Sequence, residues 1–169
     1  EALKQSGYRT GHCGKWHISK NHYDYPQPYQ HGFDSSVHNR GVQVPMKPNR
    51  LSGFATTKPQ DPYRLDDNGF PFDTPQQAAL DFLQTNKEEP FFLYYATPVP
   101  HLALQAPEDS LAQYRGKWEE TPYTGGKGYL AQAEPRATYA AMVTRLDRNV
   151  GRILDAVKEA GVEDETIII

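Results

Sequence analysis

The sequence predicts an α/β fold with a parallel or mixed β-sheet flanked by helices. Three observations support it: a strand-like segment over 8–17, an apolar and aromatic run over 90–97 bounded by prolines, and a long amphipathic helical pattern over 135–160. A chain of 169 residues has single-domain length, and its 13 glycines and 14 prolines point to long loops. We therefore expect one loop-rich α/β domain.

The first strand follows a short helix end. Residues 1–6 are typical of the end of a helix, which Gly7 closes because glycine readily takes the left-handed conformation there. The strand over 8–17 places Lys15 and His17 on the same face, since side chains alternate along a strand. An ammonium and an imidazole are therefore expected side by side at a strand end.

Loops, helices and strands alternate along the rest of the chain. Thr74 before Pro75 is typical of a helix start, and Gly161 is expected to end the long helix. In order, the expected elements are loops over 18–73 with a short strand near 42–44, a helix over about 75–86, a strand over 90–97, loops over 98–134, a helix over about 135–160, and a strand over 166–169.

Composition and charge exclude several classes of protein. The net charge is −3, and the 18 basic residues form no stripe, which argues against a nucleic-acid partner. No apolar run is long enough to predict a membrane span, and a single cysteine excludes an internal disulfide framework. Both ends resemble cut ends, so we expect a piece of a longer protein, which an export signal could precede.

Two predicted strands end in histidine, and one of these ends also carries a lysine. His101 follows the strand over 90–97, while Lys15 and His17 close the first strand. The carboxyl ends of strands in α/β sheets converge on one crevice. A cationic pocket of this kind suits an oxyanion such as sulfate or phosphate, and histidine can protonate a leaving oxygen. The alternative is a strand end that merely meets water.

Residues 7–17, GYRTGHCGKWH, resemble the second signature of the type I sulfatases, members of the alkaline phosphatase superfamily. The resemblance extends over residues 1–169, and it implies the central part of an alkaline phosphatase-like mixed sheet flanked by helices, incomplete. Further motifs follow in the family's order: Gly32-Phe33-Asp34, Pro90-Phe91-Phe92-Leu93-Tyr94, Pro100-His101, Gln105-Ala106-Pro107-Glu108, Tyr139-x-x-Met142-Val143, Leu146-Asp147-x-x-Val150-Gly151 and Thr166-Ile167-Ile168-Ile169.

The resemblance also implies roles for three residues. Lys15 would bind the sulfate group, His17 would orient or deprotonate the nucleophile, and His101 would bind the ester and protonate the leaving alcohol. The family's nucleophile is a formylglycine made from Cys or Ser in a Cys/Ser-x-Pro/Ala-x-Arg signature, which this chain lacks. The family's calcium ligands are likewise expected outside the chain, so no metal ligand is assigned within it.

The function implied is hydrolysis of a sulfate monoester, with a small molecule or glycan as substrate: a sulfated carbohydrate or an aryl or alkyl sulfate. The chain alone is expected to be inactive, and the resemblance implies a periplasmic or extracellular location. Two alternatives stay open. One is a phosphomonoester or phosphodiester hydrolase of the same superfamily, and the other is a noncatalytic, sugar-binding remnant of the fold.

Other chemically suggestive residues have simpler explanations. Cys13 is expected to be a packed strand thiol, and His12, on the opposite strand face from Lys15, a packed or supporting histidine. The remaining candidates are the loop residues His22, His31 and His38 as substrate contacts, Trp118 and Tyr123 as sugar contacts or loop anchors, Asp67-Asn68-Gly69 as a turn, and Gly125-Gly126-Lys127-Gly128 as a flexible turn.

Overall fold

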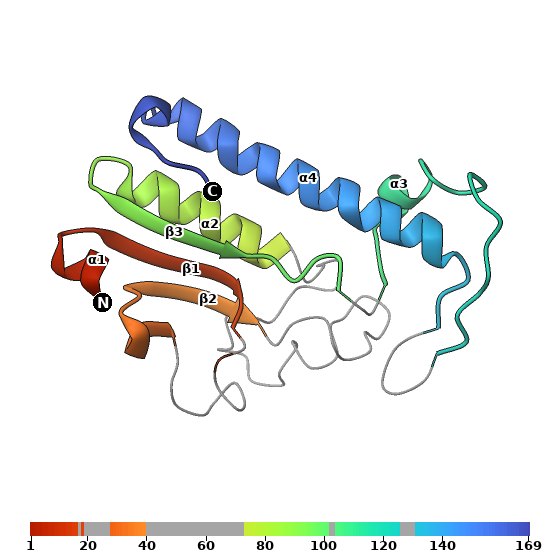
Figure 1. The fold of residues 1–169 in the computed structure, drawn as a ribbon. Helices are drawn as coiled ribbons and strands as arrows, with labels where there is room; N and C mark the ends of the chain where they lie inside the picture. Colours follow the sequence, from red (N-terminus) through yellow and green to blue (C-terminus); the bar gives the residue numbers. More distant parts are fainter. Residues whose placement is uncertain (17, 19–27, 40–72, 102–103, 126–130) are drawn as a thin grey trace.

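The computed structural model describes residues 1–16, 18, 28–39, 73–101, 104–125 and 131–169 (Figure 1). They form a three-stranded sheet with helices packed against it, which confirms the predicted α/β class. The elements are α1 (Ala2–Gln5), β1 (Arg9–Lys15), η1 (Pro28–His31), β2 (Ser35–Asn39), α2 (Asp73–Asn86), β3 (Phe91–Ala96), α3 (Glu108–Leu111), α4 (Pro135–Glu159) and η2 (Glu163–Glu165).

The sheet has the order β2-β1-β3, and β1 pairs in parallel with both neighbours. Gly14 near the end of β1 lies opposite His38 of β2 and Ala96 of β3. All three strands therefore run in the same direction and end at the same edge of the sheet (Figure 1). In α/β proteins this carboxyl edge is where ligands bind.

Helix α2 packs against β1 and β3, and α4 packs in turn against α2 and α3. The approach of α2 to β1 is close because Gly11 carries no side chain. A Cβ atom at Gly11 would lie only 2.6 Å from the Phe82 ring. Between the helices, the Gln76 amide donates a 3.3 Å hydrogen bond to the Asn149 carbonyl. Burial of α2 against the sheet thus depends on a small residue in the central strand.

Aromatic side chains gather on the sheet face that Thr10 and His12 share. Phe92 and Tyr94 of β3 lie opposite Thr10 and His12 in the strand register. Phe33 stacks on Phe92 with ring centroids 6.3 Å apart. Phe92 and Tyr94 remain 39% and 49% exposed, whereas Thr10 and His12 of the central strand are buried.

The amino ends of β1 and β2 are joined by a polar cluster formed by Lys4, Thr10, Gly32 and Asp34. The Thr10 backbone N–H donates to the Asp34 carboxylate at 3.0 Å, and the Thr10 hydroxyl lies 2.8 Å from the Gly32 carbonyl oxygen. Lys4 Nζ lies 2.6 Å from the other oxygen of Asp34. These contacts lower the pKa of the Asp34 carboxyl, chiefly through the hydrogen bond from Lys4 and also through those from Thr10. These contacts thus connect β1 and β2 at the edge away from the carboxyl ends.

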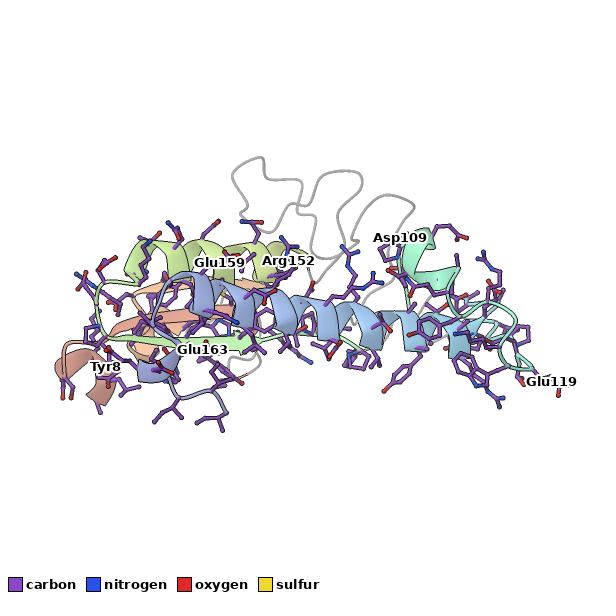
Figure 2. All side chains as sticks on the ribbon, turned by 90° about the horizontal axis from the view of Figure 1, so that it is seen from above. Tyr8, Asp109, Glu119, Arg152, Glu159 and Glu163 are labelled. Atoms are coloured by element: carbon purple, nitrogen blue, oxygen red, sulfur yellow. The ribbon has the colours of Figure 1, made fainter. Side chains whose placement is uncertain are left out.

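Helix α4 is the longest element, and its burial is uneven. Met142 and Val157 are buried, whereas Val143 and Leu154, which belong to the same apolar pattern, are largely exposed. Figure 2 shows the side chains of this helix from above, with Arg152 and Glu159 labelled. Among the described residues, no helix is both long enough and apolar enough to cross a membrane.

Two expectations for strands differ from the structure. Strand β2 was not expected, because Ser35–Asn39 contains one β-branched residue and shows no apolar alternation; it forms because its backbone pairs with β1. The expected strand over 166–169 is wrong: Thr166 is extended, but no described strand pairs with this segment, and Ile167 is 88% exposed. The short strand expected near 42–44 lies outside the described residues.

The short elements η1 and α3 lie in segments that were expected to be loops, whereas the remaining helices and strands agree closely with the sequence patterns. Gly7 follows α1 with φ +86°, and Gly161 follows α4 with φ +72°, so both glycines take the left-handed conformation expected at a helix end. The first strand is shorter than expected, Arg9–Lys15 in place of 8–17, and α2 begins at Asp73 rather than at 75.

Candidate active site

Lys15 is the last residue of β1, and its position at the carboxyl edge follows from the strand register. It is half-buried and lies opposite Asn39, the last residue of β2. The residue before it, Gly14, has φ +123°, in the region that favours glycine. Gly14 therefore departs from the usual strand dihedral angles, although the register with β2 continues to Lys15.

Glycine is also required at position 14 by the approach of β3. A Cβ atom there would lie 2.0 Å from the carbonyl oxygen of Ala96. The nearest atoms belong to the Ala96 backbone, so the backbone of β1 or β3 would have to shift to make room for it. The spacing of the two strands, and with it the position of Lys15 beside β3, depends on the absence of a side chain at Gly14.

His101 lies on the connection that leaves β3 at the same edge. Its backbone N–H donates a 2.9 Å hydrogen bond to the Pro98 carbonyl, which closes a turn. The connection is held in place by Val99, which is buried against Met142 of α4. Helix α4 thus anchors the turn that carries His101.

Two of the three predicted catalytic residues lie at, or on a connection that leaves, the carboxyl edge of the sheet. Lys15 ends β1, His101 follows the adjacent parallel strand, and the two strands are in register at Gly14 and Ala96. His17 lies outside the described residues. The roles of all three residues stay predictions.

His12 lies in β1, three residues before Lys15, and is fully buried. It was not among the predicted catalytic residues. Its Nε2 lies 3.2 Å from the carbonyl oxygen of Lys15, and its Nδ1 lies 3.1 Å from the hydroxyl oxygen of Ser36 on β2. The Trp16 ring meets the imidazole edge to face, with centroids 5.3 Å apart. The expectation that His12 is a packed histidine is confirmed, and its position links β2 to the end of β1.

Cys13 is 3% exposed, which confirms the expected packed thiol. Burial raises the pKa of this thiol to about 12, with a smaller contribution from the negative charge of Asp81. Cys13 is followed by Gly14-Lys15-Trp16-His17 and so does not match the Cys/Ser-x-Pro/Ala-x-Arg signature of a formylglycine precursor. Among the described residues, no group of three or more His, Cys, Asp or Glu side chains is placed to hold a metal ion.

The loop that follows α3 is fixed to the start of α4 by charged side chains. The Glu120 carboxylate accepts hydrogen bonds from the backbone N–H groups of Arg136 (3.0 Å) and Ala137 (2.8 Å), at the helix end where such groups lack partners. Arg115 forms ion pairs with Glu108 and with Glu134, the latter at 3.0 Å. These contacts lower the pKa of the Glu108 carboxyl, chiefly through its hydrogen bond from Arg115.

This loop lies beyond the carboxyl ends of the strands. In Figure 2, Asp109 and Glu119 lie at the end of the molecule opposite Tyr8, which precedes β1. Trp118 stacks on Tyr114 with centroids 6.0 Å apart and an angle of 12° between the rings. Tyr123 pairs with Gln132 through two backbone hydrogen bonds of 2.8 Å. Trp118 thus packs within the loop, and the side chains of Trp118 and Tyr123 both remain partly exposed.

The remaining candidates are only partly described. His31 ends η1, and its ring lies 5.4 Å from that of Trp16. The backbone of His38 belongs to β2 and reaches the carboxyl edge, which the sequence pattern did not predict. His22, Asp67-Asn68-Gly69 and residues 126–128 of the glycine-rich turn lie outside the described residues.

A comparison with known families matches the sulfatase family model over residues 1–169. Among curated proteins, the chain is 28% identical over 183 residues to N-acetylgalactosamine-6-sulfatase of Mus musculus, covering 99% of this chain and 31% of that protein. It is 25% identical to an arylsulfatase of Hemicentrotus pulcherrimus, covering 99% of this chain and 29% of that protein.

Solved structures give the same result for the fold. A crystal structure of Ps i-CgsB in complex with k-i-k-neocarrahexaose matches with a TM-score of 0.66 and 26% identity, over 94% of this chain and 36% of that one. The putative sulfatase yidJ from Bacteroides fragilis matches with a TM-score of 0.67 and 22% identity, over 96% and 40% of the two chains. The chain thus spans about a third of the length of the curated relatives named above.

Proposed function

Because the chain belongs to the sulfatase family, we propose that it is the central part of a catalytic domain that hydrolyses sulfate monoesters. The observation that carries this proposal is the position of Lys15 and the His101 turn at the carboxyl edge of adjacent parallel strands. A permanent positive charge and a titratable imidazole at one edge suit a sulfate ester, which carries a negative charge before and after cleavage.

In this proposal, the ammonium group of Lys15 binds the oxygens of the sulfate group. An imidazolium N–H of His101 donates a proton to the bridging oxygen as the S–O bond to the alcohol breaks, so that the alcohol leaves neutral. His17 orients the nucleophile or removes its proton. The nucleophile, a formylglycine in this proposal, and the calcium ion are supplied by parts of a longer protein outside these 169 residues.

The substrate proposed is a sulfated carbohydrate, with aryl or alkyl sulfates as alternatives. The names of two similar proteins favour this choice: one is an N-acetylgalactosamine-6-sulfatase, and the other was crystallised with k-i-k-neocarrahexaose. A periplasmic or extracellular location is proposed with it, because such substrates are found outside the cytoplasm.

The class of ester is tested by giving the full-length protein that contains this chain 4-nitrophenyl sulfate and 4-nitrophenyl phosphate in parallel. The two substrates share a leaving group, so kcat/KM compares the transferred groups alone. We expect the sulfate ester to be preferred. Preference for the phosphate ester would instead identify a phosphohydrolase of the same superfamily, and cleavage of neither ester and of no carbohydrate sulfate would identify a noncatalytic binding protein.

The role of His101 is tested by varying the leaving group. A nitrophenolate leaves without protonation, whereas a sugar alkoxide requires it, so His101→Ala should lower kcat only slightly for the nitrophenyl ester. For a carbohydrate sulfate, the loss should be roughly 10²–10⁴-fold, the usual contribution of a general acid. His101→Gln serves as the control that keeps the size and polarity of the side chain. Equal losses with both substrates would contradict the proposed role.

A further inference from the structure

His12 lies at the point where the end of β1 turns toward the proposed sulfate pocket. It is completely buried, at 0% exposure, between the Ser36 hydroxyl and the Lys15 carbonyl group. In the strand register, Ser36, His12 and Tyr94 form one row across β2, β1 and β3. A buried imidazole in such a row is costly unless both of its nitrogens find partners.

The hydrogen bond to Lys15 fixes which nitrogen of His12 carries the proton. A carbonyl oxygen can only accept, so Nε2 must donate to the Lys15 carbonyl oxygen at 3.2 Å. In the neutral ring Nδ1 then accepts, and the Ser36 hydroxyl donates to it at 3.1 Å. The result is a hydrogen-bonded chain from β2 through His12 to the backbone of Lys15.

This chain acts where regular strand geometry ends. Gly14, between His12 and Lys15, has φ +123°, outside the usual strand region, and Lys15 is the last residue of β1 that pairs with β2. The His12 Nε2 atom contacts the carbonyl oxygen of Lys15, and the Trp16 ring packs against the imidazole with the ring centroids 5.3 Å apart. The backbone at Gly14 and Lys15 is thus held by these side-chain contacts in addition to its strand pairing.

We propose that His12 is a positioning residue for sulfate binding: through its Nε2–H···O=C bond to Lys15 and its link to Ser36, it fixes the direction in which the Lys15 ammonium group enters the pocket. This inference rests on the proposed function, because it takes Lys15 as the sulfate-binding residue. His12 touches no substrate in it and acts through the backbone of Lys15. A small displacement of a binding group can lower the rate markedly, which is why a supporting residue is expected there.

A double-mutant cycle in the full-length protein tests this inference. His12→Phe keeps the ring volume and removes both hydrogen bonds, so we expect it to raise KM for 4-nitrophenyl sulfate roughly tenfold, about the effect of one lost hydrogen bond. In a Lys15→Ala background, the same substitution should change KM less than about twofold, because the group that His12 positions is absent. His12→Gln, whose amide N–H can reach the Lys15 carbonyl, should restore much of the wild-type KM.

Thr10→Val is the matched control for stability. Thr10 is buried on the same face of β1, two residues before His12 and at the far end from Lys15. Its loss should lower the midpoint of urea unfolding and leave KM unchanged. An equal effect of His12→Phe in the two Lys15 backgrounds would show a merely structural histidine and overturn the inference, even with sulfatase activity confirmed.

The tautomer of His12 gives a second readout that needs neither activity nor a folded variant. Nitrogen-15 NMR of the imidazole in the wild-type protein should show a protonated Nε2 and an unprotonated Nδ1 at neutral pH. The opposite tautomer would overturn the inference. If the wild-type protein cleaves no sulfate ester while the Nε2–H tautomer is observed, the proposed function fails and the positioning role for sulfate fails with it, although the hydrogen bond itself stands.

Discussion

Gly14→Ala is expected to be the most destabilising glycine substitution in the described part of β1. The added Cβ would lie 2.0 Å from the carbonyl oxygen of Ala96, a backbone atom that cannot rotate away. A non-glycine residue at φ +123° costs about 1–3 kcal/mol of strain. The backbone shift that relieves the contact costs about 1–3 kcal/mol more, so we expect the free energy of unfolding to fall by about 2–6 kcal/mol.

Two other glycines separate these contributions. Gly7 has φ +86° and nothing within 4 Å of an added Cβ, so Gly7→Ala should cost only the conformational strain, about 1–2 kcal/mol. In Gly11→Ala the Cβ would meet the Phe82 ring at 2.6 Å, so this variant reports the packing contribution of about 1–3 kcal/mol. All three are compared by urea unfolding of the full-length protein. A Gly14→Ala variant no less stable than Gly7→Ala would refute the close approach of β1 and β3.

Three further predictions concern stability and reactivity. The pKa of the Asp34 carboxyl is lowered in the folded protein, mainly by Lys4, so its contribution to stability is present above the unfolded pKa of about 4 and is lost as pH falls through the folded value. Asp34→Asn should therefore remove part of the decrease in the urea midpoint between about pH 5 and pH 2. A pH profile unchanged by this substitution would contradict the ion pair. With a pKa of about 12, Cys13 should resist iodoacetamide at pH 8 in the native protein and react in urea, as followed by peptide mass spectrometry; rapid native labelling would contradict its burial. Met142→Ala should lower the free energy of unfolding by about 2–5 kcal/mol through loss of packing on Val99. Met142→Leu, which nearly keeps the volume, should lower it by less than about 1.5 kcal/mol. Equal losses in the two variants would show that side-chain volume at this site does not matter.

The elements with strong periodic patterns could be predicted from the sequence, because their burial depends on their own residues. The apolar run of β3 and the long pattern of α4 are examples, and each was found within a residue or two of its expected bounds. Strand β2 could not be predicted, since Ser35–Asn39 gains its strand conformation from pairing with β1 and not from its side chains. The segment over 166–169 shows the converse: a strong β-branched pattern forms no strand where no described strand lies beside it.

The candidate site likewise contains residues that could be predicted from the sequence and a contact that could not. Lys15 and His101 were predicted because strand ends and parallel topology are visible in the sequence, and the structure places both at the carboxyl edge. The contact of His12 with the Lys15 carbonyl was not predictable, because it depends on the bend at Gly14, whereas strand alternation only assigns His12 to the opposite face. The backbone conformation at Gly14 creates that contact, and an alternating pattern of side chains in the sequence does not reveal such a conformation.

The most direct test of the sulfatase proposal is the rate of sulfate release from 4-nitrophenyl sulfate, measured for the full-length wild-type protein and for Lys15→Ala. If Lys15 binds the sulfate group, kcat/KM should fall by roughly a hundredfold or more, as expected on removal of a charge that stabilises the transition state. Unchanged turnover in Lys15→Ala, or no release of sulfate by the wild-type protein, would contradict the proposal.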